Sequence, residues 1–298
     1  MGCMLCPRKC GADRDNSVGF CGMGNNARVA RAALHFWEEP CISGTRGSGA
    51  VFFSGCVMRC VYCQNYEISA RRSGKEISVE RLSEIFLELQ SQGAHNINLV
   101  NPTHFVPQII SALDIARAGG LSIPVVYNSG GYERVETLRM LEGYVDIYLP
   151  DIKYYDDTAA KELSSASDYF ETAMAAAEEM LRQTGEPMFG EGEAQGLLKR
   201  GTVVRHLVLP KMYKDSAEII KRVGNRFGSR IIFSLMSQYT PCGAVGSDER
   251  LAFLNRRITT FEYQKALNAV LDAGPEGYMQ ERSSAKEEYT PDFDLTGV

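Results

Sequence analysis

The sequence predicts an α/β fold, a partial (β/α)6 TIM-like barrel preceded by a small N-terminal cysteine-rich metal-binding segment. Three observations lead to this prediction. From residue 50 onward, short apolar runs alternate with longer amphipathic stretches, a period typical of parallel strands joined by crossover helices. Six apolar runs of strand length are found, whereas a closed barrel of this type has eight strands. The first 48 residues differ in composition, because five cysteines and several glycines interrupt them, and four of these cysteines lie within the first 21 residues.

The order of strands and helices follows from the apolar pattern. The first strand is expected at 50–53, where Ala-Val-Phe-Phe forms a continuous apolar run. Ser78 is a candidate cap for the next helix, whose apolar side chains between Val79 and Leu89 share one face. The other strands are expected at 96–101, 123–128, 145–151, 203–210 and 231–236. The other helices are expected at 106–118, near 134–141, within 157–184, and at 216–227 and 261–272.

Composition limits the cellular setting and the partners. The 298 residues are 44% hydrophobic and 23% charged, which is ordinary for a globular protein with a sizeable core. A net charge of −5 gives no basic footprint for DNA or for an anionic membrane. No apolar run reaches the roughly 18 residues of a membrane span, and the N-terminus lacks a signal-peptide core. We therefore expect a cytoplasmic protein with no DNA or membrane partner. In such a reducing compartment, nine cysteines favour metal ligation over disulfides.

Three cysteines follow the first strand with the spacing C-x3-C-x2-C. They are Cys56, Cys60 and Cys63, and Gly55 allows a sharp turn before the first of them. Three thiolates on one loop can hold three corners of a [4Fe–4S] cluster, and the fourth iron then stays open for another ligand. The alternative is a zinc site, but zinc usually takes four protein ligands, so the sequence favours the cluster.

This spacing, with the aromatic Tyr62 just before the last cysteine, resembles the signature of the radical S-adenosylmethionine (SAM) superfamily. The resemblance implies that the open iron binds the amino and carboxylate groups of SAM. It also implies that an electron from the cluster, supplied by a donor such as flavodoxin or ferredoxin, cleaves SAM. The products are methionine and a 5′-deoxyadenosyl radical that abstracts hydrogen.

A second cysteine set lies near the N-terminus. Cys3, Cys6, Cys10 and Cys21 have the spacing C-x2-C-x3-C-x10-C. Four thiolates can close a structural zinc site or hold a second iron–sulfur cluster, and the spacing does not choose between them. We therefore divide the chain into a cysteine-rich segment at 1–48, a barrel at 49–281 and a polar tail at 282–298.

Polar residues follow the second and third predicted strands. Members of the resembled superfamily commonly have a Gly-Gly-Glu-like motif after the second strand, which binds the amino group of SAM. This chain has Asn101, Pro102, Thr103 and His104 there, so the carboxylate is missing. The hydroxyl and amide side chains are still expected to accept hydrogen bonds, and His104 either contacts the ligand or opens the following helix. After the third strand, Asn128 and Ser129 are expected to line the SAM pocket.

The fourth and fifth predicted strands carry charged residues. Asp151 and Lys153 resemble the Asp-Leu-Lys motif of enzymes that activate glycyl-radical enzymes, in which the lysine pairs with the SAM carboxylate and the aspartate helps to hold a cation. Arg205, on an interior strand, needs a carboxylate partner. We expect Lys153 and Arg205 both to bind the carboxylate of SAM.

The whole chain resembles most closely the proteins similar to pyruvate formate-lyase-activating enzyme that have an N-terminal four-cysteine motif. The resemblance implies an oxidoreductase that abstracts hydrogen from the glycine α-carbon of a protein partner. One alternative is radical modification of a peptide, nucleoside or small metabolite, and another is a non-catalytic iron–sulfur or zinc module. The segments 42–49 and 185–200 are candidate lids over the site.

Overall fold

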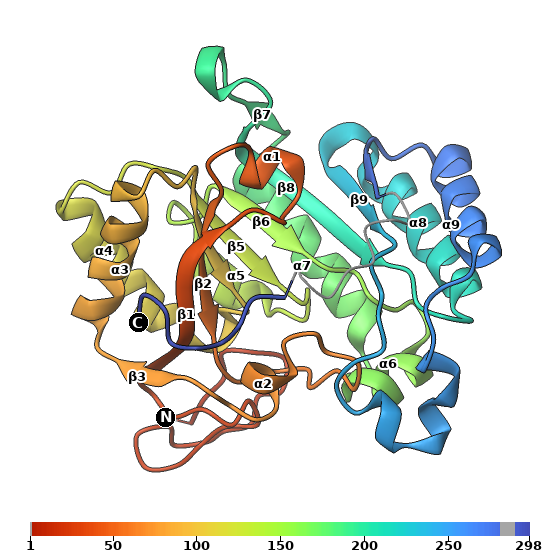
Figure 1. The fold of residues 1–298 in the computed structure, drawn as a ribbon, viewed down its shortest axis with the longest axis horizontal. Helices are drawn as coiled ribbons and strands as arrows, with labels where there is room; N and C mark the ends of the chain where they lie inside the picture. The colour runs from red at the N-terminus through yellow and green to blue at the C-terminus, as the bar shows by residue number, and fades with distance from the viewer. Residues whose placement is uncertain (1, 281–289) are drawn as a thin grey trace.

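The computed structural model describes residues 2–280 and 290–298 (Figure 1). Its strands are β1 (Ala27–His35), β2 (Ser48–Phe53), β3 (Lys75–Ile77), β4 (Ile97–Val100), β5 (Val125–Ser129), β6 (Ile147–Pro150), β7 (Met188–Phe189), β8 (Leu198–Leu207), β9 (Ile232–Met236) and β10 (Gly277–Met279). Its α-helices are α1 (Pro40–Ser43), α2 (Tyr66–Ser69), α3 (Val79–Ser91), α4 (Val106–Ala118), α5 (Val135–Met140), α6 (Asp157–Ser164), α7 (Tyr169–Thr184), α8 (Tyr213–Phe227) and α9 (Thr260–Ala273).

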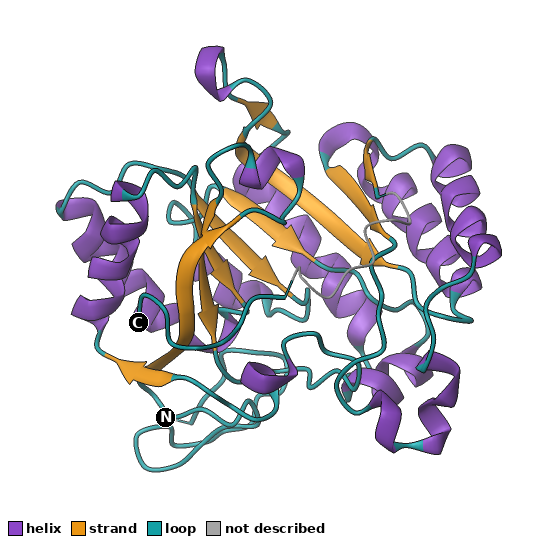
Figure 2. Cartoon of the chain, in the orientation of Figure 1, coloured by secondary structure: helices purple, strands orange, loops and turns teal. Residues whose placement is uncertain are grey.

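The strands form one open, mostly parallel sheet with helices against its outer face (Figure 2). The strand order is β10-β9-β8-β6-β5-β4-β2-β1-β3, and all neighbours from β10 to β2 are parallel. β1 is antiparallel to β2, and β3 is antiparallel to β1. Within the described residues β3 and β10 do not pair with each other, so the barrel is not closed. This arrangement confirms the predicted α/β fold with a partial barrel.

Local sequence explains where the helices begin and end. The Ser78 hydroxyl accepts a hydrogen bond from the backbone N–H of Arg81 at 3.2 Å, as the predicted cap of α3 requires. The helical region predicted at 157–184 is two helices instead of one. The break comes at Ser165, whose left-handed backbone (φ 55°) ends α6. α7 starts again at Tyr169, and it packs against β6 and β8.

Residues on either side of the barrel extend the sheet at its β1 edge. Residues 27–35, for which no strand was predicted, form β1 and pair with β2. The tail was predicted at 282–298, of which 282–289 lie outside the described residues. The remainder runs along β1, where the N–H of Ala32 donates to the carbonyl of Thr296 at 2.8 Å. The ring of Phe293 also contacts Phe52, so this part of the chain covers the edge of the sheet.

The two predicted lids are at the wrong end of the barrel. The segment 42–49 leads into β2 and the segment 185–200 leads into β8, so both lie at the amino ends of parallel strands. The cysteine loop follows β2 and therefore lies at the opposite, carboxyl ends. Figure 1 shows this separation, with α1 and β7 at the top and the N-terminal segment at the bottom. Neither segment can cover the cysteine loop.

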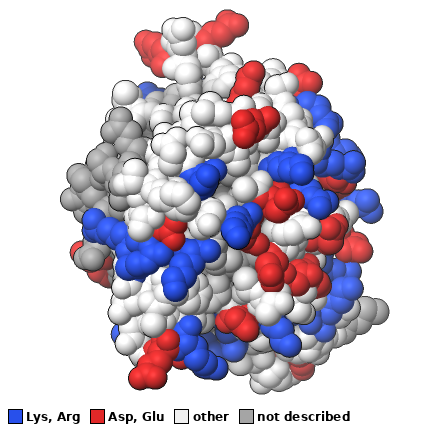
Figure 3. All heavy atoms as spheres, turned by 90° about the vertical axis from the view of Figure 1, so that its right-hand side faces the viewer, with Lys and Arg blue, Asp and Glu red and all other residues white. Residues whose placement is uncertain are grey.

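The surface and the helices carry no single dominant feature. None of the helices within residues 2–280 and 290–298 combines the length and the apolar character that crossing a membrane requires. On the face that Figure 3 shows, basic and acidic side chains occur next to one another. Cysteines and buried charged side chains gather at the carboxyl edge of the sheet.

Candidate active site

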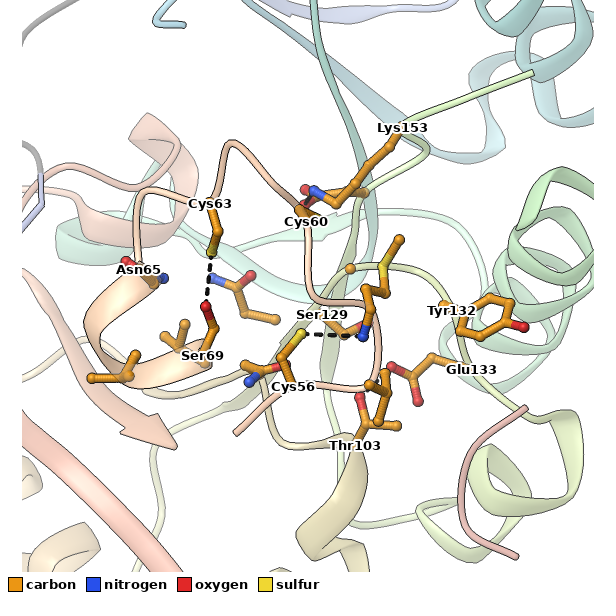
Figure 4. A pocket seen from close by; sticks show the side chains of 18 of the residues that line it. Cys56, Cys60, Cys63, Asn65, Ser69, Thr103, Ser129, Tyr132, Glu133 and Lys153 are labelled. Atoms are coloured by element: carbon orange, nitrogen blue, oxygen red, sulfur yellow. Dashed lines mark hydrogen bonds and ion pairs between the residues drawn. The ribbon is translucent and has the colours of Figure 1, made fainter. Parts of the chain in front are cut away.

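The cysteine loop after β2 is held in a shape that only glycine permits at its first turn. Gly55 has φ +81°, and a Cβ at this position would lie 2.4 Å from the side chain of Met23 and 2.8 Å from the carbonyl of Cys21. The three cysteines that follow line one cavity, to which β4, β5, β6 and β8 also contribute residues. Figure 4 shows Cys56, Cys60 and Cys63 around the same hollow, with Lys153 beyond Cys60 and Glu133 beyond Cys56.

Each of the three sulfurs accepts one hydrogen bond. The backbone N–H of Met58 donates to Cys56 at 3.3 Å, the Ser164 hydroxyl donates to Cys60 at 2.9 Å, and the Ser69 hydroxyl donates to Cys63 at 3.3 Å. Such donors stabilise negative charge on a ligating sulfur.

Burial opposes ionisation of two of these thiols, Cys60 and Cys63. It raises the pKa of Cys60 to about 12 and that of Cys63 to about 11. A bound cation must therefore displace their protons. Within residues 2–280 and 290–298, no group of three or more His, Cys, Asp or Glu side chains is placed to hold a single metal ion. A cubane cluster makes a different demand, because each cysteine binds its own iron.

Glu133 is a site residue that the sequence analysis missed. It lines the same cavity as the cysteines and is only 2% exposed. Its carboxylate accepts hydrogen bonds from the Thr103 hydroxyl at 2.6 Å and the Tyr127 hydroxyl at 3.1 Å. Burial raises the pKa of Glu133 to about 7, because no positive side chain of the described residues pairs with it. The loop after β4 brings no carboxylate to the cavity, but the loop after β5 does.

The four residues 101–104 after β4 do not all reach the cavity. Asn101 and Thr103 line it, and the Asn101 amide donates to the carbonyl of Gly55. His104 lies behind the cysteine loop instead. Its Nε2 is 2.7 Å from the carbonyl of Ser54 and its Nδ1 is buried without a partner. Burial lowers the pKa of His104 to about 4, so the ring is neutral at pH 7. A role in shaping the turn before Cys56 accounts for its placement.

Asp151, Lys153 and Arg205 meet in a buried charge network. Asp151 is 2.5 Å from the Nζ of Lys153 and accepts from the Nε of Arg205 at 2.8 Å. Burial acts to raise the pKa of Asp151, but Arg205 and Lys153 outweigh it and hold that pKa below its usual value. Arg205 also pairs with Glu38 at 3.1 Å and donates to Asn128 at 2.6 Å. Its guanidinium is therefore already bound by two carboxylates of the chain itself.

Lys153 is the freer of the two cations. Its only ion pair among the described residues is the one with Asp151, and its charge favours the ionised form of the Cys60 thiol. Asn128 and Ser129 line the same cavity. Asn128 bridges Arg205 and Glu38, since its amide donates to Glu38 at 3.1 Å. The sequence analysis brought these strand-end residues together correctly, but it did not foresee Glu38, which comes from the loop after β1.

Tyr62 faces a second cavity that shares a wall with the first. Its hydroxyl lies 2.6 Å from that of Tyr154, which lies 2.6 Å from the Ser164 hydroxyl. The shared wall consists of Cys60, Cys63, Asn65, Val100, Asn128, Asp151, Lys153 and Arg205. The second cavity extends from this wall to Trp37, Gln238 and Pro291. A molecule in the second cavity would therefore lie next to one in the first.

The four N-terminal cysteines lie near one another under the cysteine loop. A Cβ on Gly19 would be 3.4 Å from the sulfurs of both Cys10 and Cys21, and burial raises the pKa of Cys6 to about 12. Within the described residues, these cysteines are not placed so that three of them could hold a single metal ion. A second metal site here remains a prediction.

Comparison with known proteins gives this geometry a context. A family model described as the radical SAM superfamily matches residues 50–194, which include the cysteine loop. An uncharacterised protein of Methanocaldococcus jannaschii is 28% identical over 274 residues, 89% of this chain and 73% of that protein.

Two solved structures align with this chain at low identity. The [FeFe]-hydrogenase maturase HydG superposes with a TM-score of 0.51 and 16% identity, over 75% of this chain and 48% of HydG. Streptococcus suis SuiB bound to S-adenosylmethionine gives a TM-score of 0.49 and 11% identity, over 76% of this chain and 48% of SuiB. The chain thus spans about half the length of these two proteins, and at this identity the HydG match shows a common fold.

Proposed function

We propose that the chain, whose residues 50–194 match the radical SAM superfamily, binds a [4Fe–4S] cluster through Cys56, Cys60 and Cys63 and binds SAM in the adjoining cavity. The observation that carries this proposal is the set of three sulfurs that line one cavity, each with its own hydrogen-bond donor. Three thiolates leave one iron without a protein ligand, which is the position that SAM would occupy.

The charges of the cavity fit the amino-acid end of SAM. SAM carries an ammonium group and a carboxylate next to each other. Glu133 offers a buried carboxylate without a cation, and Lys153 offers a cation whose ion pair with Asp151 is the only one it makes. In Figure 4 the two side chains lie on the same side of the three cysteines, Lys153 beside Cys60 and Glu133 beyond Cys56. We therefore assign Glu133 to the ammonium, which must lose one proton before its nitrogen can bind the open iron, and Lys153 to the carboxylate. Arg205 is not assigned a direct contact, because its donors are already engaged.

A bound cluster would supply the electron that splits SAM into methionine and a 5′-deoxyadenosyl radical, and this radical would take a hydrogen atom from the substrate. The chain's own residues position the reacting groups and keep water away. Met58 and Val57 are buried beside the cysteines, and a substrate in the second cavity would lie next to the first because the two cavities share a wall.

The finer proposal concerns the substrate. The Asp151 and Lys153 pair and the strand of Arg205 resemble those of glycyl-radical-enzyme activators, which supports a glycine α-carbon of a partner protein as the hydrogen donor. The second cavity is the route for such a segment, because Trp37, 54% exposed, marks its outer end. A ferredoxin or flavodoxin would supply the electron. Modification of a peptide, nucleoside or small metabolite would use the same route.

Loss of the cysteine ligands tests the proposed function most directly. We expect Cys56→Ala, Cys60→Ala and Cys63→Ala each to abolish 5′-deoxyadenosine formation in reduced protein, because one iron loses its thiolate. Iron content and the electron paramagnetic resonance (EPR) spectrum of anaerobically reconstituted protein measure the cluster, and chromatography measures the nucleoside. Cys41→Ala is the matched control, since that buried thiol lies outside both cavities. Undiminished product from all three site variants would refute the cluster assignment.

The substrate proposal has its own measurement. We would add the wild-type enzyme to a glycyl-radical-enzyme partner and record the EPR signal of a glycyl radical. Formation of 5′-deoxyadenosine without that signal would keep the radical chemistry and overturn the glycine assignment.

A further inference from the structure

The N-terminal segment 2–26, which we call the knuckle, packs directly against the cysteine loop. The backbone N–H of Cys56 donates to the carbonyl of Cys21 at 3.3 Å. The Arg59 side chain donates to the carbonyl of Phe20, and its guanidinium lies 4.2 Å from the centre of the Phe20 ring. Figure 1 shows the knuckle beneath the carboxyl ends of the strands. The loop that carries the three cysteines therefore rests on a second, separately built surface.

Arg8 of the knuckle joins this loop to the end of α6. Its Nε donates to the carbonyl of Val57 at 2.8 Å, between the first two cysteines. Its Nη2 donates to the carbonyl of Ser164 at 3.2 Å, and its Nη1 donates to that of Ser165. The guanidinium also lies 4.3 Å from the centre of the Phe20 ring, so one face of it is covered. A single side chain thus bonds three carbonyls on two segments that lie far apart in the sequence, Val57 of the cysteine loop and the adjacent Ser164 and Ser165.

The carbonyls at the end of α6 have few other donors. A helix leaves its last four carbonyls without partners inside the helix, and a cation there also complements the helix dipole. The left-handed backbone of Ser165 turns the chain away at this point. Arg8 therefore fixes the position of the last turn of α6 relative to the cysteine loop.

The last residue of α6 also contacts the site. Ser164 is fully buried, and its hydroxyl donates to the sulfur of Cys60 at 2.9 Å. A second link between the same elements is the N–H of Val61, which donates to the carbonyl of Leu163 at 2.9 Å. A displacement of the end of α6 would move both the Ser164 hydroxyl and the Leu163 carbonyl. The short contact between Ser164 and the Cys60 sulfur would change first.

We infer that Arg8 is a positioning residue through which the knuckle holds the Ser164 hydroxyl on the sulfur of Cys60, and that this contact sets the reduction potential of the cluster at that loop. The inference rests on the proposed function, because it needs a cluster. A hydrogen bond to a ligating sulfur stabilises the more negative, reduced cluster and raises the potential. The knuckle then serves the chemistry from outside the cavity, since Arg8 lines neither cavity wall.

The test is an anaerobic redox titration of the reconstituted cluster, followed by EPR, in the wild type, Arg8→Gln, Ser164→Ala and the double variant. We expect both single variants to shift the midpoint potential to more negative values. The double variant should match Ser164→Ala, because Arg8 acts through that hydroxyl. Arg226→Gln is the control, as this exposed arginine pairs with Glu178 far from the site and should leave the potential unchanged. Arg8→Lys keeps the charge but not the three-point contact, so it should shift the potential less.

Three results would overturn the inference: a wild-type potential in Arg8→Gln, no shift in Ser164→Ala, or additive shifts in the double variant. A wild-type chain that assembles no cluster would instead refute the proposed function. The anchoring can then still be measured in the metal-free protein by hydrogen–deuterium exchange. We expect Arg8→Gln to speed exchange at the amides of Cys56 and Val61, and unchanged exchange at both would overturn the anchoring.

Discussion

Arg205 and Glu133 are two buried charges on walls of the same cavity, and the chain treats them in opposite ways. Arg205 has every side of its guanidinium occupied, by Asp151, Glu38 and Asn128. Glu133 receives only neutral hydroxyl donors, and burial raises its pKa to about 7. A buried charge needs compensation. The chain itself compensates Arg205, whereas no cation of the described residues compensates Glu133. This difference is the reason why we propose Glu133, and not Arg205, as a ligand-binding group.

The largest expected effect is on stability. Arg205→Ala leaves Asp151 and Glu38 buried without their common cation, and removing one partner of a buried pair typically costs about 3–5 kcal/mol. We expect a loss of this order in the free energy of unfolding, measured by urea denaturation of the metal-free protein. Arg226→Ala removes an exposed pair and should cost less than about 1 kcal/mol. If the two variants lose equal stability, Arg205 is not the interior clamp described above.

The next effect is on SAM affinity. Glu133→Gln keeps the size and the hydrogen-bond acceptor but loses the charge that would face the ammonium. A charge-assisted hydrogen bond contributes about 1.5–3 kcal/mol, so we expect SAM to bind roughly tenfold to a hundredfold more weakly. Isothermal titration of SAM into the cluster-loaded variant measures this change, with iron content as a check. Glu136→Gln, on the exposed side of α5, is the matched control. Equal affinity in Glu133→Gln and the wild type would leave the ammonium without its proposed partner.

The smallest effect is a pH dependence in the metal-free protein. The folded pKa of Glu133 is about 7, above the ordinary value of 4.5, so the native state binds more protons than the unfolded state between these values. The contribution of Glu133 to stability is thus full below about pH 4.5 and is lost as pH rises through 7, by roughly 1.4 kcal/mol per pH unit at most.

Urea denaturation at pH 5, 6, 7 and 8 measures this dependence. The wild type should lose stability relative to Glu133→Gln as pH rises across this window. A constant difference between the two proteins would show that Glu133 does not titrate there. In the cluster-loaded protein the affinity for SAM should rise as pH increases through 7, because its ammonium favours the ionised carboxylate.

The fold was predictable because apolar periodicity is a local property. The helix predicted at 106–118 has the bounds of α4, and the cap at Ser78 is present. β1 was missed because its arginines and alanines do not form an apolar run and because it follows the cysteine-rich segment. Its strand character comes from pairing with β2, a contact that no local pattern shows.

The site was only partly predictable, for a related reason. The cysteine spacing places three ligands on one loop, so the sequence shows them directly. Glu133 follows two glycines in a stretch that reads as an ordinary turn, and its burial depends on Thr103, 30 residues away. The sequence nonetheless contained an indication of Glu133. It is an acidic residue just after a predicted strand, and the loop after the neighbouring strand lacks the carboxylate expected there. The partner of Arg205 was even harder to predict from the sequence, because Glu38 is 167 residues away in the chain.

That separation has a kinetic consequence. The contact between Glu38 and Arg205 joins the loop after β1 to β8, so it can form only after the intervening strands and helices have assembled. Contacts with such long loops cost entropy to close and form late in folding. A late contact contributes little to the folding transition state and mainly slows unfolding. The network at Arg205 therefore governs how long the native barrel survives once formed, more than how fast it forms.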